Sequence, residues 1–75
     1  MPTLHRIGAI RICMYLNDHN PPHFHALLGN DAVQIKIADL TVLAGGLPPN
    51  ALRSVLSWAA DHRGLLATAW ANYSE

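Results

Sequence analysis

The stretch NDHNPPHFHALLG, residues 17–29, gathers side chains that can do chemistry. It holds three histidines, His19, His23 and His25, and Asp18 precedes the first of them. Imidazoles titrate at about pH 6.5, so they serve as general acids and bases near neutrality, and neutral imidazoles bind metal ions. Three of them this close together make the stretch the first candidate for a functional site.

Metal binding is one chemistry open to this cluster. His23 and His25 are two residues apart, so they would project from one face of a strand. The third ligand would be His19 or Asp18, and Cys13 would be a fourth. Zinc takes four ligands, or three and a water molecule, but none of the familiar Cys and His spacings of zinc sites is present. We therefore expect no obligatory cofactor, and a divalent metal such as zinc, held by these three histidines, is the alternative.

Anion binding or acid–base catalysis is the other chemistry. Arginine can hold a phosphate through two hydrogen bonds, and the tyrosine hydroxyl donates one. Together with histidines, such a set resembles what metal-independent phosphodiester cleavage requires. No nucleophilic triad is visible in the sequence, so we assign no catalytic residue. The candidate binding surface comprises Arg11, Tyr15, Asp18, His19, His23 and His25.

Alternating hydrophobic residues predict the strands that would position these side chains. Residues 10–16 alternate with a period of two, which is typical of a half-buried strand, and residues 23–28 do the same. Residues 17–22 between them are predicted to form a loop, because Asn, Asp and Pro interrupt extended pairing. A strand over 33–37 and a short last strand over 41–43 complete the predicted sheet.

The register of the first two predicted strands bears on the cluster. If Tyr15 lies across from His23 or His25, the apolar residues 10, 12, 14, 24 and 28 share one face. Arg11, Cys13 and Tyr15 then share the other face with the two histidines. A slip of one residue would mix the two sets, so the hydrophobic pattern favours the register that gathers the polar groups.

Helical spacing begins after Pro48 and Pro49, which are tolerated only in a first helical turn. Apolar residues seven apart, from Leu52 to Tyr73, favour one long helix, with Gly64 tolerated at a cost of roughly 1 kcal/mol. Two helices separated near Gly64 are the alternative. The sequence thus predicts a single α+β domain over residues 1–75, a three- or four-stranded antiparallel meander packed under a C-terminal helix or a pair of helices.

Composition limits the partners and the location of this 75-residue chain. Hydrophobic residues make up 51% and charged residues 13%, which is apolar for a small monomer, so we expect a homo-oligomer or a companion small protein. Five basic and five acidic residues cancel, so charge does not support nucleic-acid binding, although it does not exclude it. A lone cysteine and the absence of any long apolar run favour a cytoplasmic protein without a membrane span.

The segment RICMYLNDHNPPHFHALLG and the tail from Val33 to Trp70 resemble the bacterial family known as domain of unknown function 4160. The resemblance rests on Asn-Asp-His, the prolines and His-Phe-His-Ala, and covers nearly the whole chain. Asn20 stands where the family usually has a third proline, and Gly64 where it usually has a charged residue. The resemblance implies a small bacterial protein, often encoded beside another small domain in an arrangement like a toxin–antitoxin pair, and it implies no mechanism.

Two functions follow as hypotheses. The first is an intracellular interaction or regulatory module, one half of a toxin–antitoxin-like pair, with the histidine-rich polar patch as its functional surface. The second is a small metal-dependent hydrolase or ribonuclease-like enzyme using His19, His23 and His25. An enzyme needs these histidines around one cavity, whereas a binding module needs only a surface.

Overall fold

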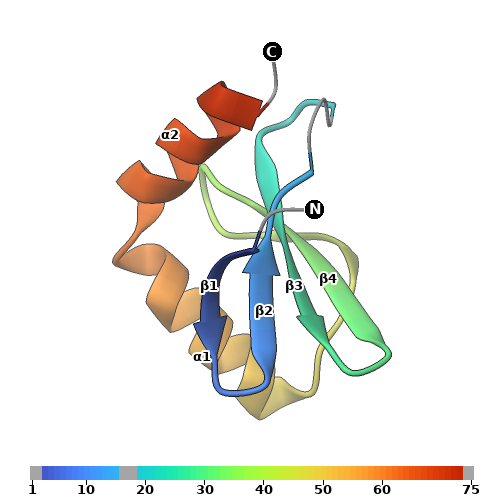
Figure 1. The fold of residues 1–75 in the computed structure, drawn as a ribbon. Coiled ribbons are helices and arrows are strands. Elements are labelled where there is room, and N and C mark those ends of the chain that lie inside the picture. The colour runs from blue at the N-terminus through green and yellow to red at the C-terminus, as the bar shows by residue number, and fades with distance from the viewer. Residues whose placement is uncertain (1–2, 16–18, 74–75) are drawn as a thin grey trace.

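The computed structural model describes residues 3–15 and 19–73, which form five strands followed by two helices (Figure 1). The strands are β1 (Thr3–Ile7), β2 (Ile10–Cys13), β3 (His23–Leu28), β4 (Asp31–Lys36) and β5 (Val42–Gly45). The helices are α1 (Pro49–Ala60) and α2 (Arg63–Tyr73). The fold class is therefore α+β, as the sequence predicts.

The five strands form one antiparallel sheet in the order β1-β2-β3-β4-β5, so every strand pairs with its neighbour in the sequence. The prediction of three or four strands was wrong by at least one strand. It began the first strand at residue 10, whereas residues 3–7 form a strand of their own and the chain reverses at Gly8 and Ala9 to form a β1–β2 hairpin. Gly8 has a φ of 57°, a conformation that glycine adopts readily in two-residue hairpin turns.

The predicted register between β2 and β3 is confirmed. Ile12 lies opposite Ala26, and Cys13 lies opposite His25. Ile12, Met14, Phe24 and Ala26 are fully buried in the core on one side of the sheet. Arg11, Cys13 and His25 therefore lie on the other side, as the hydrophobic pattern requires.

Both helices pack on the apolar side of the sheet (Figure 1). Val55 and Ala59 of α1, and Leu66 and Trp70 of α2, join the buried strand residues in one core cluster. No described helix or strand covers the opposite side of the sheet. We call that side the open face, and the register assigns to it Arg6, Arg11, Cys13, His23, His25, Leu27, Ala32, Gln34, Lys36 and Ala44.

The helical segment is divided in two, which corrects the preference for one long helix. Asp61 and His62 donate their backbone N–H groups to Trp58 and Ala59 three residues earlier, instead of continuing the four-residue pattern. The Nδ1 atom of His62 also lies 2.7 Å from the Trp58 carbonyl oxygen, which a continuing helix would pair with the His62 backbone N–H. The side chain of His62 thus replaces a helical hydrogen bond, and α2 starts afresh at Arg63.

None of the helices in the described part of the chain is long and apolar enough to cross a membrane.

Candidate functional site

The histidine-rich stretch contributes to the open face, but its members have different surroundings. His23 is buried with 4% of its surface exposed, His25 is half-buried, and His19 is exposed in the loop before β3. Asp18 lies outside the described residues. The structure therefore brings His23 and His25 together on adjacent parts of one strand and leaves His19 in the preceding loop.

His23 is held in place by contacts on two sides. Its Nδ1 atom lies 2.7 Å from the carbonyl oxygen of Pro21, and because a carbonyl can only accept, Nδ1 carries the hydrogen. Its ring centroid lies 5.2 Å from that of Trp70 on α2, which extends toward the end of the sheet where β3 begins (Figure 1). The register puts His23 on the polar side as predicted, but Trp70 closes that end of the sheet and buries the ring.

His25 lies at the centre of a row of aromatic contacts on the open face. The ring of Tyr15 meets the ring of His25 edge-on, with centroids 4.3 Å apart. The ring of His23, two residues earlier on the same strand, has its centroid 5.1 Å from that of His25. Tyr15 and His25 are both half-buried. The two predicted site residues are therefore in direct contact and partly accessible.

Arg11 and Cys13 occupy the part of β2 next to this row. Arg11 is half-buried opposite Leu27, and Cys13 is fully buried opposite His25. Burial raises the pKa of the Cys13 thiol, and the positive charge of Arg11 partly offsets this effect. Cys13 is thus a buried neutral thiol beneath the open face rather than a nucleophile.

Metal coordination needs several ligands that converge. In residues 3–15 and 19–73, no group of three or more His, Cys, Asp or Glu side chains is arranged to hold a metal ion. The predicted ligand set of His19, His23 and His25 gains no further described ligand in the fold.

A second aromatic cluster lies on the helix side of the sheet and was not anticipated. His5 of β1 stacks on Trp58 of α1 with ring centroids 4.9 Å apart, and His62 stacks on Trp58 at 4.5 Å. The register shows why His5 is here: it lies opposite Ile12, so it shares the side of the sheet that α1 covers.

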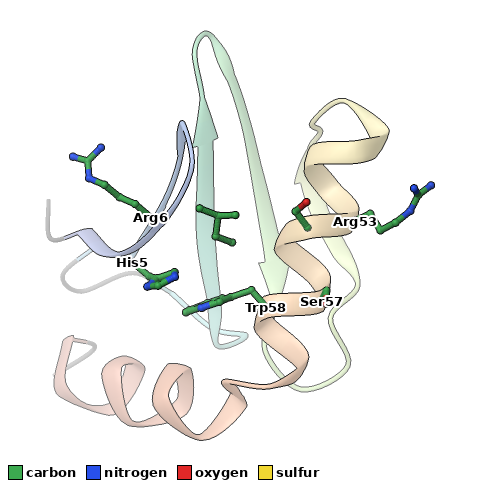
Figure 2. Close-up of a pocket in the computed structure, with 7 residues that line it drawn as sticks. His5, Arg6, Arg53, Ser57 and Trp58 are labelled. Atoms are coloured by element: carbon green, nitrogen blue, oxygen red, sulfur yellow. The ribbon is translucent and has the colours of Figure 1, made fainter.

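Two depressions lie between β1 and the helices, and neither includes His19, His23 or His25. The first, about 490 Å³, lies between β1 and α1, and Figure 2 shows His5 and Trp58 pointing toward one another there. Arg6 and Arg53 also border it, but in Figure 2 both side chains point away. The second, about 430 Å³, lies between Leu4 of β1 and α2.

The fold and the site define a small α+β protein whose sheet is covered by two helices on one side and carries aromatic and cationic side chains on the other. The chain belongs to the family described as Domain of unknown function (DUF4160), whose model matches residues 9–71. The matched range includes the whole histidine-rich stretch, all of α1, and α2 as far as Ala71. No curated protein and no solved structure matches this chain.

Proposed function

We propose that this protein is an interaction or regulatory module that binds a companion protein through the open face of its sheet. The observation that carries the proposal is the composition of this face. Half-buried Tyr15 and His25 touch at its centre, with Arg11 and Leu27 paired beside them. Tyr and Arg are enriched in the centres of protein interfaces, where a few such residues supply most of the binding energy.

Binding is favoured over catalysis by the way the histidines are held. An enzyme would need His23 and His25 to converge on one cavity with a third group. His23 instead orients its ring by its bond to Pro21 and packs against Trp70, and the two depressions described above lie elsewhere. A buried imidazole beside a half-buried one suits recognition better than proton transfer.

Charge favours a different protein over a second copy of this chain on the open face. The register places Arg6, Arg11 and Lys36 on this face. A two-fold dimer across it would bring two copies of the same cationic patch together, and no described carboxylate on this face would offset their charge. A partner with an acidic surface is complementary to it. We further propose that this partner is encoded beside the gene, as in a toxin–antitoxin-like pair.

The proposal is tested by co-expressing the chain with the product of the adjacent gene and measuring the affinity of the purified pair. Alanine at both Tyr15 and His25 should weaken binding at least tenfold, since central interface aromatics commonly contribute about 2 kcal/mol or more. Arg53→Ala, on the exposed side of α1, is the matched control and should change the affinity less than twofold.

Absence of binding to the neighbouring protein, or equal binding by the double variant, would count against the proposal. Cleavage of a labelled RNA by the purified chain, lost on His25→Ala, would favour the ribonuclease-like alternative.

A further inference from the structure

Two arginines lie directly opposite one another in the β1–β2 hairpin. The register pairs Arg6 with Arg11, next to the pair formed by Ile7 and Ile10 at the turn. Residues opposite one another in an antiparallel pair share a face, and their Cβ atoms are about 5 Å apart. Like charges at such positions are unfavourable. The chain thus contains an arrangement that works against the stability of its own hairpin.

Among residues 3–15 and 19–73, the neighbouring positions on the open face carry no acidic side chain to neutralise the pair. Leu27 lies opposite Arg11, and Ala32 lies opposite Leu27, so the row continues with apolar residues. Among the described acidic residues, Asp31 lies opposite Leu28 and so belongs to the helix side. The others lie in the turn after β4, where Asp39 bonds to Thr41, and at the end of α1.

We propose that Arg6 and Arg11 form a binding site for one carboxylate group of an acidic segment of the companion protein. This inference rests on the proposed function and names the chemistry that the partner must present. The guanidinium groups of two opposed arginines can each present paired N–H donors to one carboxylate. The negative charge of that carboxylate would offset the repulsion between the arginines.

A protein carboxylate fits this site better than a nucleic acid. The pair is bordered by Leu27 and lies on the same face as Tyr15 and His25, a mixture of apolar, aromatic and cationic side chains that is typical of protein interfaces. Binding to a phosphate backbone requires a basic stripe, and this chain has five basic and five acidic residues.

The site is tested on the full chain alone, with a capped hexaglutamate peptide as the probe and amide chemical shifts as the readout. We expect the shifts of the β1–β2 hairpin to move, and the Arg6→Gln/Arg11→Gln variant to lose at least tenfold in affinity. The control is Arg53→Gln/Arg63→Gln, which removes the same charge from the helices and should lose less than twofold. A uridine hexamer is titrated in parallel, and tighter binding of this RNA at the same residues would overturn the choice of partner.

Stability supplies a second readout that a structural role would not produce. Without the probe, Arg6→Gln should raise the Tm by about 1–4 °C, because it relieves a like-charge pair. A fall in Tm, or equal losses of peptide affinity in the two double variants, would overturn the inference.

The two proposals fail separately. If the peptide binds at the arginines but the adjacent gene product does not bind, the anion site stands and the proposed function falls. If the companion binds and the arginine variants leave its affinity unchanged, the function stands and this inference falls.

Discussion

His23 and His25 share a sheet face but should respond differently to truncation. His23 is buried, bonded to Pro21 and packed on Trp70, so His23→Ala removes buried volume and a hydrogen bond and should lower the free energy of unfolding by about 2–3 kcal/mol. His25→Ala, at a half-buried position, should cost about 1 kcal/mol or less. Urea denaturation of both variants gives the comparison, and equal losses would contradict this account of His23.

The sequence predicts the side of the sheet on which each histidine lies, but it does not predict burial. Alternation in residues 10–14 and 23–28 determines the side, because a slip of one residue would place apolar groups in water. Burial of His23 depends instead on Trp70, a residue of the last helix. Nothing in the local pattern around His23 specifies that long-range contact.

Asp39 gives a residue-scale prediction about pH. The hydroxyl and the backbone N–H of Thr41 both donate to Oδ1 of Asp39, at 2.8 and 3.2 Å, and these bonds lower the pKa of the carboxyl group. A lowered folded-state pKa means that the bonds stabilise the protein above the ordinary carboxyl pKa, and that this contribution is lost as the pH falls through the folded-state value.

Thr41→Val removes the hydroxyl donor, so the Asp39 pKa should rise toward its ordinary range in an NMR titration. The stability difference between this variant and the parent chain should shrink as the solution becomes more acidic. Thr68→Val, at an exposed position on α2, is the matched control and should leave the Asp39 pKa unchanged.

At the scale of elements, β5 depends on one glycine. The register between β4 and β5 shifts after Gln34, which pairs with Ala44, and Gly45 adopts a φ of 73° where the chain turns away. A methyl group on Gly45 would overlap the backbone of Ala32, and the positive φ adds strain for any other residue. Gly45→Ala should therefore cost about 2 kcal/mol or more of stability.

Gly46→Ala is the matched control, because a methyl group at Gly46 meets open space. It should change the free energy of unfolding by less than about 0.5 kcal/mol. Thermal unfolding of the two variants tests the comparison, and a Gly45→Ala protein as stable as the parent would show that the β4–β5 edge can rearrange.

The elements that sequence analysis missed have identifiable causes. A single N-terminal strand would put Ile7 and Ile10 on opposite faces, whereas a two-residue turn at Gly8 and Ala9 puts them opposite each other on one face. The need to place Ile7 and Ile10 on the same face was the signal in the sequence for a fifth strand. Gly64 was the only sequence signal for the helix break, and the spacing of seven, which survives the break, outweighed it. The bond between His62 and the Trp58 carbonyl, which ends α1, is not apparent from the sequence.

At the scale of the whole molecule, balanced charge conceals an uneven distribution. The chain has a formal net charge of zero, yet folding places Arg6 and Arg11 opposite one another on the open face and Asp31 on the helix side. Lys36 also lies on the open face, and Asp39, in the turn after it, is near enough for the two charges to interact. Composition alone therefore predicts no electrostatic surface. Only the register, which pairs residues distant in sequence, reveals one.

Salt should affect the binding of a companion protein and the self-association of this chain differently. Binding of an acidic companion to the open face should weaken between about 0.05 M and about 0.5 M NaCl, because salt screens the attraction. Self-association, expected from the apolar composition, should involve other surfaces, since Val42, Leu43 and Leu65 are the large exposed hydrophobic residues of the described chain.

Sedimentation of the chain alone should therefore give a mass above 8.2 kDa that does not fall as NaCl rises. Salt does not screen apolar contacts, whereas it does screen the repulsion between cationic faces. Arg11→Glu should leave this mass unchanged, whereas Leu43→Lys should lower it. A monomer at every salt concentration would contradict the expected self-association. A dimer that dissociates with added salt would place the self-contact on charged surface, and would remove the reason for assigning the open face to a different protein.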